Sequence, residues 1–481
     1  MKLDLRSLAV SRIFLGFLVM LDTVFRMQNF EAHYTEEGTL GLSLLQKFYA
    51  PTGPCLQCLS PHASWSFFLL VLLLISSFAM MIGWKTRFSI FLTWLLTISL
   101  HFRNPLIVDG GDVLLRCFLF WMLFLPTAKV LSHDSGYKKF SDVQNPTIKS
   151  WAFLTLPVQI FLLYFASAIL KSGKEWWPDG TASGFALSLE AFVTPFGKWI
   201  TQFPEGLKTM TKLVYLMELL GGFLFFLPAH FRTVGVFIFI AFHMGLGAVL
   251  DLALFPWVAT ACLLSLLPTE AWERMAQKLN WPQFKKQITK AKKTFVLPQK
   301  EIILAWMAMP FLASVLAWNI LSYQKKAMYE PLRKTMLFLH LDQYWGMFAP
   351  YPLKDSGWFE FRTKLWDGNY AQTFVHPKMR SNWDNFKQKP IQGNEYFVDQ
   401  RWRKYLVNLW ERSNASFRVG LAEYLCREWN KEHELPSDKA EQLNMSFRLF
   451  VNQEYLVPPR EGKPIDLGTY NCPHNDEVSK F

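Results

Sequence analysis

The sequence predicts a polytopic α-helical membrane protein with about nine transmembrane helices, followed by a soluble α+β domain that is exported across the membrane. Hydrophobic residues make up 51% of the 481 residues and charged residues only 18%, against about 25% charged residues in average soluble proteins. Nearly uncharged stretches recur through the first two-thirds of the chain, each close to the ~20 residues that cross a hydrocarbon core of ~30 Å. From about Tyr323 onward, charges interleave with short apolar runs instead.

Nine stretches are candidate membrane helices. The third and the eighth are short, so a re-entrant or buried helix remains an alternative for either. The stretches are Leu8–Phe25, Ser66–Trp84, Phe88–Phe102, Val113–Leu131, Trp151–Leu170, Leu213–Pro228, Val234–Leu250, Leu252–Leu267 and Glu301–Leu321.

The placement of positive charge predicts the orientation. The net charge is +12, which in a soluble protein could indicate nucleic-acid binding. Here Lys and Arg concentrate in the loops after the second, fourth, sixth and eighth stretches, and Thr269–Lys300 alone holds eight of them against two acidic residues. Because cytoplasmic loops hold the excess of Lys and Arg, we expect a cytoplasmic amino terminus, an exported carboxy-terminal domain, the lipid bilayer as a partner and no nucleic acid.

The exported domain is expected to combine strands and helices. The aromatic runs Trp358–Trp366 and Phe447–Val451 are typical of strands, while Phe417–His433 has the apolar spacing of a helix. The expected organisation is a transmembrane domain at residues 1–268, a basic cytoplasmic loop at 269–300, a last transmembrane helix at 301–322 and the exported domain at 323–481.

The six cysteines fall into two groups. Two lie inside apolar stretches and are expected to be small packing residues. The other four are expected on the exported side, where disulfide bonds persist, and we predict a structural disulfide at each of two places, with a redox-active CxxC as the alternative. Nothing completes a set of four zinc ligands, so no metal is predicted. The four disulfide candidates are the CxxC pair Cys55 and Cys58, and Cys426 and Cys472; the packing residues are Cys117 and Cys262.

Ionisable side chains inside apolar stretches are candidates for a functional site, because a charge buried in a bilayer costs several kcal/mol unless it is paired. In the first stretch, Arg12 and Asp22 are ten residues apart, too far to pair along one helix. Each therefore needs a partner elsewhere, and a structural ion pair with a neighbouring helix is the expectation for both.

A second group precedes the fourth stretch. Asn104 follows the third stretch, and Asp112 lies four residues before Arg116. This spacing places a carboxylate and a guanidinium on one face at the start of a helix, on the exported side. The alternative is that Asp112 is simply the N-cap of that helix.

A third group lies at the exported end of the fifth stretch and includes Trp176. Lys174 is expected to reach the membrane interface with its ammonium group. Lys171 differs, because it directly follows Ala168-Ile169-Leu170 and could be desolvated enough to act as a general base.

The fourth group is Glu218 in the sixth stretch and His243 in the seventh. A lone buried His is often only a hydrogen-bonded core residue. On adjacent helices, however, Glu218 and His243 could share a proton, which would suit a pocket for a quinone or a carboxylate.

Taken in order, these residues resemble the vitamin K-dependent gamma-carboxylase family, and within it the bacterial proteins with a horizontally transferred transmembrane (HTTM) domain. The resemblance runs from Leu8 to Pro268, and its pieces keep their order and spacing. They are Leu8–Arg12, Gly16–Asp22, Met80–Arg87, Arg103–Asp112, Ile169–Trp176, Phe242–Pro256 and, after the ninth stretch, Leu341–Pro350.

The resemblance implies an endoplasmic-reticulum enzyme architecture with a counterpart in the bacterial inner membrane. Animal members deprotonate a reduced quinone with a Lys, react it with oxygen to form a strong base, remove the γ proton of a peptide Glu and add carbon dioxide. Lys171 falls on the catalytic Lys of the family, and Glu218 and His243 fall on an acidic residue and a His of the family. Where the family has a second catalytic residue, a His before the fourth span, this sequence has Asp112, which can orient Lys171 or accept a proton but cannot donate one as an imidazolium does.

The expected function is therefore quinol-coupled, oxygen-dependent modification of an exported peptide or protein, with carboxylation of Glu, a carbon–carbon lyase reaction, as the reference activity. The expected cofactor is reduced vitamin K or menaquinol from the quinone pool. The expected catalytic residues are Lys171, Asp112 and His243, and the pocket is expected to be lined by Arg116, Glu218, Asn104 and Trp176.

Two other functions remain open at this level. One is a maturation or binding protein for exported peptides that performs no carboxylation, with or without thiol exchange at Cys55 and Cys58. The other is a transporter, which is less expected because the sequence shows no inverted repeat of discontinuous helices. The sequence does not indicate the oligomeric state.

Overall fold

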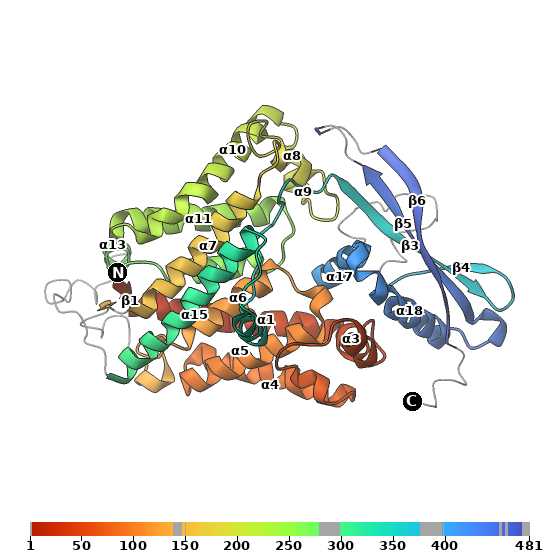
Figure 1. The fold of residues 1–481 in the computed structure, drawn as a ribbon, viewed down its shortest axis with the longest axis horizontal. Helices are drawn as coiled ribbons and strands as arrows, with labels where there is room; N and C mark the ends of the chain where they lie inside the picture. Colours follow the sequence, from red (N-terminus) through yellow and green to blue (C-terminus); the bar gives the residue numbers. More distant parts are fainter. Residues whose placement is uncertain are drawn as a thin grey trace.

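The computed structural model describes residues 2–137, 147–149, 151–278, 299–375, 397, 399–451, 455–456 and 460–473. Figure 1 shows a body of long helices, with a small antiparallel sheet at the end opposite the amino terminus. Helices α17 (Gln400–Trp410) and α18 (Arg418–Glu432) lie between the helical body and the sheet. The predicted combination of a helical membrane part with a smaller α+β part is confirmed at this level.

Each of the nine predicted apolar stretches contains a helix in the described part of the chain. The fourth ends earlier than predicted, because Pro126 and the turn before it cannot continue a helix. The helices are α1 (Leu5–Gln28), α4 (Ala63–Ile82), α5 (Thr86–Arg103), α6 (Gly110–Met122), α7 (Thr155–Leu170), α10 (Pro204–Leu220), α11 (Ala229–Val249), α12 (Phe255–Leu264) and α15 (Gln299–Tyr323).

Six of these helical segments, counted over the described residues, are long and apolar enough to cross a membrane: α1, α4, α10, α11, α15 and the segment Trp151–Leu170 that contains α7. The count of nine spans is not confirmed. Helices α6 and α12 have 13 and 10 residues, which at 1.5 Å per residue is roughly 20 and 15 Å. Hydropathy alone cannot distinguish a helix buried among other helices from one that faces lipid.

Shorter elements connect these helices. They include a two-stranded sheet in which β1 pairs with β2 in antiparallel fashion. The elements are β1 (Lys2–Asp4), α2 (Phe30–Tyr34), α3 (Leu42–Phe48), β2 (Thr147–Lys149), α8 (Ala182–Leu187), α9 (Pro195–Ile200), α13 (Thr269–Lys278) and α16 (Glu330–Phe338).

Local sequence explains where several helices begin and end. Asp4 caps α1 by accepting a hydrogen bond from the amide of Arg6 at 2.8 Å. Helix α4 ends at Gly83, whose φ of 72° is left-handed; a Cβ there would also lie 2.3 Å from the side chain of Ser132. Glycine is therefore required at this helix end.

The helices of the body run back and forth between two ends. At the amino-terminal end, Thr86 bonds Asp134 from the next loop, and Trp272 of α13 donates to Ser7 of α1. The opposite end contacts the carboxy-terminal domain and is called the sheet end here. The basic loop predicted at Thr269–Lys300 begins at the amino-terminal end. Of this loop, the structure describes α13 and residues 299–300. The predicted basic residues outside the described part are Lys285, Lys286, Lys290, Lys292 and Lys293.

The carboxy-terminal sheet has the order β4–β3–β5–β6, and all its neighbours are antiparallel. The predicted strands and the predicted helix at Phe417–His433 are confirmed, the latter as α18. Leu421 and Leu425 of α18 are fully buried, and the ring centre of Trp410 in α17 lies 4.1 Å from that of Phe447 in β5. The strands are β3 (Asp355–Leu365), β4 (Tyr370–Thr373), β5 (Ala440–Val451) and β6 (Arg460–Asn471).

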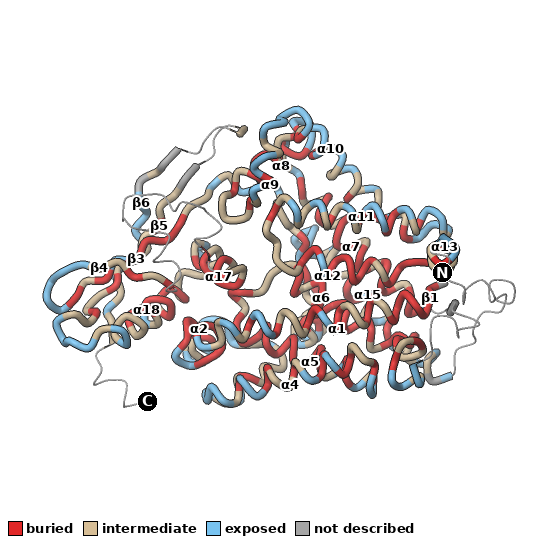
Figure 2. The backbone as a smooth tube through the Cα atoms, turned by 180° about the vertical axis from the view of Figure 1, so that it is seen from behind, coloured by how far each residue is buried: buried red, intermediate tan, exposed pale blue. Residues whose placement is uncertain are grey.

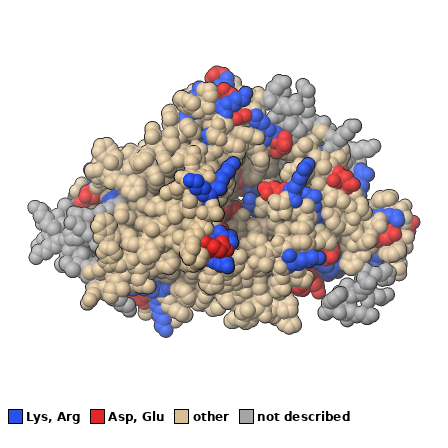
Figure 3. Space-filling view, in the orientation of Figure 1, with Lys and Arg blue, Asp and Glu red and all other residues tan. Residues whose placement is uncertain are grey.

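Burial separates inner from outer helices. Figure 2 shows α6 and α12 mainly as buried backbone, whereas α10 and α11 carry many exposed residues. The exposed side chains of α10 and α11 include Leu213, Leu220, Phe231 and Phe237. Figure 3 shows few charged residues over the helical body and a concentration of them toward the sheet side and over α8 and α10. An apolar surface of this kind suits contact with lipid.

Candidate functional site

The first polar cluster is at the start of α6. Asp109 is the N-cap of α6 and accepts hydrogen bonds from the amides of Gly111 and Asp112 at 2.7 and 3.1 Å. The Asp112 carboxylate in turn accepts from the Asp109 amide at 3.0 Å, which completes a capping box. Asp112 is therefore not itself the N-cap, which was the alternative from the sequence. It lies in the first turn and keeps acceptor sites for side chains.

Two arginines pair with this cluster. Arg26 bonds Asp22, one turn earlier on α1, at 2.6 Å and Asp112 at 2.7 Å. Arg401 binds Asp112 through both terminal nitrogens at 2.5 and 3.1 Å, and its Nη2 bonds Asp22 at 2.6 Å. Asp109 lies 3.7 Å from Arg401. Three carboxylates thus face two guanidinium groups, which leaves an excess of one negative charge when all are ionised.

Among the three carboxyl groups, protonation of Asp109 would remove the excess negative charge. Burial, together with the neighbouring Asp112, raises the pKa of Asp109, although Arg401 opposes this shift. Asp109 also accepts a side-chain hydrogen bond from Gln400. The cluster is called the Asp–Arg cluster below and comprises Asp22, Arg26, Asp109, Asp112 and Arg401.

The carboxy-terminal domain supplies Arg401 through the first turn of α17. Asp399 caps α17 by accepting from the amides of Arg401 and Trp402 at 2.6 and 2.9 Å. Trp402 donates to Asn29 at 3.2 Å, and Arg403 bonds the Asp251 carboxylate at 2.8 Å. Neighbouring residues of one helical turn therefore hold the two parts of the protein together.

A small pocket opens beside the Asp–Arg cluster. Its walls combine the carboxylates and Arg401 with apolar side chains from α1, α6 and α12. The lining residues are Leu18, Asp22, Asp109, Gly111, Asp112, Leu115, Leu254, Phe255, Val258, Gln400 and Arg401.

The second polar cluster surrounds Lys171, where α7 ends. The Lys171 ammonium donates to the carboxylate of Glu218 on α10 and lies 4.3 Å from the centre of the Trp176 ring. Lys171 and Glu218 are 4% and 6% exposed. Lys171 is buried, as the sequence predicts, and its closest partner is a carboxylate on a neighbouring helix.

His243 lies in the same region but has another partner. Its Nε2 shares a hydrogen bond with the hydroxyl of Tyr164 on α7 at 2.8 Å, and the Tyr164 ring stacks on Phe239 with centres 3.9 Å apart. Glu218 and His243 therefore have different hydrogen-bond partners, Lys171 and Tyr164. Over the described residues, Nδ1 of His243 and Oγ of Ser167 are buried without a hydrogen-bond partner.

A non-helical segment closes the Lys171 region from the sheet end. It is called the connecting segment here and comprises residues 339–354, which the sequence placed in the exported domain. Phe348 accepts a hydrogen bond from the Trp176 indole at 3.1 Å, and Pro350 accepts from the Gly173 amide at 2.9 Å. Lys354 bonds Glu175 at 2.6 Å. The segment thus fixes the loop that follows Lys171.

The connecting segment also enters the helical body. Gln343 is 3% exposed and accepts hydrogen bonds from Gln159 of α7 at 2.7 Å and from the Trp345 indole at 2.9 Å. Non-helical backbone at this depth is tolerated when protein buries its polar groups. The backbone carbonyl of Gln343 accepts a hydrogen bond from the Trp318 indole at 3.1 Å, so protein satisfies this polar group.

Arg116 binds this segment instead of Asp112. It donates to the His340 ring at 2.9 Å and to the Asp342 backbone carbonyl at 2.7 Å. Burial and Arg116 lower the pKa of His340, so its ring is neutral near pH 7. Burial opposes ionisation of Asp342, but Arg116 and His340 outweigh it and lower the pKa of Asp342.

Comparison with known proteins bears on residues 1–272, which match the HTTM domain. The chain belongs to the HTTM domain family. It is also similar to the sporulation-delaying protein SdpB of Bacillus subtilis (strain 168), at 24% identity over 192 residues that cover 39% of this chain and 56% of SdpB. The chain thus matches only about half the length of this curated relative. No solved structure matches the chain.

The HTTM family and the apolar helices together identify a membrane protein. The HTTM segment contains Lys171, Glu218 and His243, together with Asp22, Arg26, Asp109 and Asp112 of the Asp–Arg cluster. Arg401, His340 and Asp342 lie outside it. In this HTTM protein, residues beyond the family segment therefore complete the ion pairs of residues within it.

The structure separates the predicted HTTM site into two clusters. Asp112 was expected to pair with Arg116 and to orient Lys171, but it binds Arg26 and Arg401, while Lys171 binds Glu218. Phe255 lies between them, because it lines the pocket beside Asp112 and its ring centre is 5.3 Å from that of His243. The i, i+4 spacing of Asp112 and Arg116 permits a pair, but stronger partners are available to both.

Two other predicted residues have backbone partners. Arg12 was expected to form an ion pair, yet it donates to the carbonyls of Met80 and Leu131 at 2.6 and 2.5 Å, and no carboxylate of the described residues lies within 4 Å. It satisfies carbonyls that the end of α4 leaves open. Asn104 donates to the His33 carbonyl at 3.1 Å, and its own side-chain oxygen is buried without a described partner.

Several residues near the site were not predicted. Burial and the charges of Arg401 and Arg26 lower the pKa of His33 to about 3, so this ring is neutral. Nε2 of His101 lies 3.6 Å from Asp112. Tyr164 could have been found, because it lies seven residues before Lys171 and so on the same face of one helix. No local signal links Arg401 to its partners.

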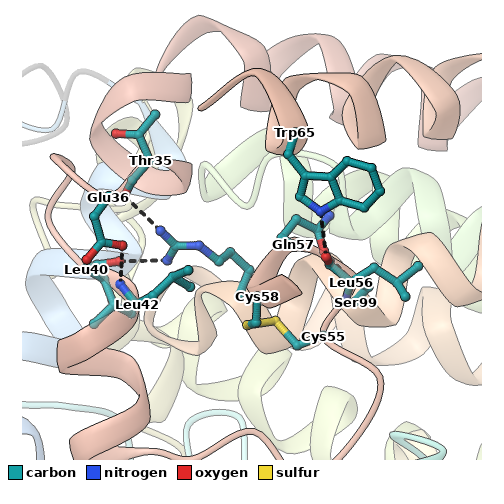
Figure 4. Close-up of a disulfide and its surroundings, with 11 residues drawn as sticks. Thr35, Glu36, Leu40, Leu42, Cys55, Leu56, Gln57, Cys58, Trp65 and Ser99 are labelled. Atoms are coloured by element: carbon teal, nitrogen blue, oxygen red, sulfur yellow. Dashed lines mark hydrogen bonds between the residues drawn. A yellow bond between two sulfur atoms is a disulfide. The ribbon is translucent and has the colours of Figure 1, made fainter. Parts of the chain in front are cut away.

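The predicted disulfides are present. Cys55 is bonded to Cys58 and Cys426 to Cys472, while Cys117 and Cys262 are free and buried. Figure 4 shows the Cys55–Cys58 disulfide near Gln57, Ser99 and Trp65. In the described part of the chain, no group of three or more His, Cys, Asp or Glu side chains is placed to hold a metal ion.

The disulfides can be tested by alkylation without reduction. We expect the unreduced, unfolded protein to gain two alkyl groups, on Cys117 and Cys262, and the reduced protein to gain six. Mass spectrometry of the peptides around Cys55 and Cys58 measures the first pair separately from the second. Alkylation of Cys55 and Cys58 before reduction would contradict the disulfide between them.

Proposed function

We propose that this HTTM protein is a quinol-coupled, oxygen-dependent membrane enzyme that modifies an exported peptide or protein, with carboxylation of Glu as the reference activity. The buried contact between Lys171 and Glu218 carries the proposal. Ionisable groups inside membrane proteins are expensive to bury and commonly mark functional sites. The resemblance of Lys171 to the catalytic lysine of the gamma-carboxylase family supports the same position.

The pair gives Lys171 a way to become a base. The Lys171 ammonium contacts the Glu218 carboxylate directly, so that carboxylate is positioned to receive the proton that Lys171 must release to act as a base. A neutral Lys171 amine can then accept a proton from an acidic hydroxyl of a substrate. The proton of the original ammonium stays on Glu218 during this step.

The surroundings of Lys171 fit a reduced quinone. Ser167 Oγ on α7 and His243 Nδ1 on α11 are buried polar atoms without described partners, and we propose that they bind the oxygens of the quinone. Lipid-facing α10 supplies Glu218 and adjoins the bilayer, from which the quinone pool is accessible. When bound, reduced vitamin K or menaquinol supplies a base through its reaction with oxygen that is stronger than any side chain.

In this proposal Asp112 is a positioning residue. Two guanidinium groups hold its carboxylate, so it cannot donate a proton as the His of the family does. Its contacts fix the start of α6 and the first turn of α17. Arg116 has a similar role, because it holds the connecting segment, which in turn holds Trp176.

The experiment that tests the function uses the purified full-length protein with menaquinol, oxygen, labelled bicarbonate and Glu-containing peptides. We expect label in the peptide and an oxidised quinol product, both dependent on Lys171. Absence of both, with Lys171→Ala indistinguishable from wild type, would overturn the enzyme proposal.

We further propose that the protein lies in the bacterial inner membrane with the amino-terminal end of the body in the cytoplasm and the sheet end outside. The alternating run of all nine helices and the basic residues at the amino-terminal end support this orientation. In that orientation, the short helices α6 and α12 would cross the membrane surrounded by other helices of the protein rather than by lipid.

The orientation can be tested with single cysteines at two exposed described positions, Lys278→Cys in α13 and Glu434→Cys after α18. In spheroplasts, we expect a membrane-impermeant maleimide to label Glu434→Cys at once and Lys278→Cys only after lysis. The wild-type protein is the control, because its cysteines are either disulfide-bonded or buried. The opposite labelling pattern would reverse the proposed topology.

A second candidate function is favoured by the Cys55–Cys58 disulfide. A CxxC disulfide in an exported loop can exchange with thiols of an exported peptide, so the protein could act in peptide maturation without carboxylation. Loss of peptide processing in a Cys55→Ser, Cys58→Ser variant, with Lys171→Ala unaffected, would favour this function over the first.

A further inference from the structure

Helix α9 is held against the end of α11. Thr194 caps α9 by accepting from the Gly197 amide at 3.0 Å, and its hydroxyl donates to the Ala248 carbonyl at 2.6 Å. A Cβ added at Gly197 would lie 2.2 Å from the Val249 carbonyl oxygen, so glycine is required for this close approach. Figure 1 shows α9 at the sheet end of the helical body. The position of α9 relative to α11 is therefore fixed.

The length of α11 sets the depth of α9 in a bilayer. Helix α11 is apolar enough to cross a membrane and has 21 residues, which at 1.5 Å per residue is roughly 31 Å, close to the ~30 Å of a hydrocarbon core. Its side chains Val234, Phe237 and Ile238 are exposed, as suits contact with lipid. Val249, the last residue of α11, thus lies near the boundary between the acyl chains and the headgroups, and α9 lies beside it.

The exposed side of α9 carries a row of aromatic rings that continues toward α10. Phe196, Trp199 and Phe203 are 49%, 52% and 52% exposed. The ring centres of Phe196 and Trp199 are 5.6 Å apart, and those of Trp199 and Phe203 are 5.2 Å apart. Lys198, between the first two, is also exposed. Aromatic side chains concentrate where a membrane meets water, and a lysine there can extend its ammonium to the lipid phosphates.

The segment that contains α9 is also bonded to the carboxy-terminal domain. Arg403 of α17 donates to the Ala191 carbonyl at 3.0 Å, and its guanidinium lies 4.7 Å from the centre of the Phe192 ring. Asp251, which accepts from Arg403, donates its amide to the Phe192 carbonyl at 2.7 Å. Residues 191–203 are called the aromatic platform below. The platform joins the end of α11 to the first turn of α17.

We propose that the aromatic platform binds the phospholipid headgroup layer at the sheet end of the bilayer, with Phe196 and Trp199 at the upper acyl chains and Lys198 at the phosphates. Bound in this way, the platform holds the first turn of α17, and with it the carboxy-terminal domain, at a fixed height above the bilayer. None of these residues belongs to the Lys171 site, so lipid binding here does not depend on the proposed chemistry.

The test measures the depth of nitroxide labels at single cysteines. The full-length protein is placed in nanodiscs of phosphatidylcholine and phosphatidylglycerol, and its native cysteines do not compete for label because they are disulfide-bonded or buried. EPR power saturation gives the accessibility to oxygen, which partitions into lipid, relative to a water-soluble nickel chelate. We expect this ratio to be several-fold higher at Phe196→Cys and Trp199→Cys than at Leu435→Cys. Leu435 is the matched control, an apolar residue of the carboxy-terminal domain that is 62% exposed.

Two more positions calibrate the depth. Phe237→Cys, on α11, should give the highest ratio, and Lys198→Cys a ratio between those of Trp199→Cys and Leu435→Cys. Ratios at Phe196→Cys and Trp199→Cys equal to that at Leu435→Cys would overturn the proposal, because both positions would then lie in water. Low accessibility to both reagents would also overturn it, because a second copy of the chain or another protein would then cover the platform. Thermal unfolding verifies that each variant is folded.

Discussion

Replacing Arg401 with methionine is expected to destabilise the protein by about 3–5 kcal/mol, the range for removing one partner of a buried ion pair. Methionine keeps much of the apolar stem but removes the guanidinium that binds Asp112 and Asp22. Three carboxylates of the Asp–Arg cluster would then face Arg26 alone. Thermal unfolding of the purified protein in detergent measures the change.

The matched control lies two residues away. Arg403 makes a similar contact between the two parts of the protein, but its partner Asp251 has a side chain that is 46% exposed. Water can solvate the Asp251 carboxylate when the pair is removed, although Arg403 also donates to the backbone carbonyls of Ala191 and Asp251. Arg403→Met should therefore cost less than Arg401→Met, about 1–3 kcal/mol. Equal destabilisation by Arg401→Met and Arg403→Met would show that burial of the Asp–Arg cluster does not set the effect.

The pH dependence of Arg401→Met provides an independent check. In the folded wild type, burial and Asp112 already raise the pKa of Asp109, and Arg401 restrains that shift. Without Arg401 the folded pKa rises further above the unfolded value, so the folded state binds the proton more tightly. Stability of the variant should therefore increase, more than that of wild type, as the pH falls through the raised pKa of Asp109 toward the unfolded value of an Asp carboxyl, about 3.9. Adding Asp112→Asn should recover part of the lost stability.

Replacing Lys171 has the largest expected effect on activity. We expect Lys171→Ala to lower kcat by roughly 10²–10⁴-fold, the range for a positioned general base. Lys171→Arg should not restore activity, because a guanidinium keeps its proton even when Glu218 is near. Glu218→Gln should also lower kcat, since it removes the acceptor for the lysine proton.

Lys174→Met is the matched control for the Lys171 variants. Lys174 lies three residues further along the chain, is exposed and makes no described side-chain contact with the Lys171 site. It should retain wild-type kcat within about twofold. Quinol-dependent label uptake measures kcat, and thermal unfolding verifies that each variant is folded. Full activity in a folded Lys171→Arg variant would exclude the lysine as the base.

The sequence predicted the parts of the site that depend on local spacing. Over the described residues, the apolar stretches predicted the nine helices of the helical body. The position of Lys171 after an apolar run predicted its burial. The ion pair expected between Asp22 and another helix is formed by Arg401 of α17, whereas the pair of Asp22 with Arg26, one turn later on α1, was not predicted. Cys55 and Cys58 are three residues apart and do form a disulfide. The burial of Lys171 and this disulfide follow from the geometry of one helix or one turn.

The partners of the buried charges could not be predicted from one sequence. Glu218 had two partners available, His243 and Lys171, and hydropathy does not distinguish them. Asp112 and Arg116 lie one turn apart on α6, close enough to pair. They instead bind Arg401 and His340, which are more than 200 residues away in the sequence. The buried helices α6 and α12 read as membrane spans because core and lipid both select apolar side chains.

The contact between Arg401 and Asp22 joins residues 379 positions apart, and this has a consequence for biosynthesis. At a synthesis rate of 5–20 residues per second, Asp22 is made roughly 20–75 s before Arg401. During that interval the newly inserted helices must hold the carboxylates of the Asp–Arg cluster with Arg26 alone. Chains that terminate before α17 would keep these charges uncompensated, which offers membrane quality control a means to recognise incomplete protein.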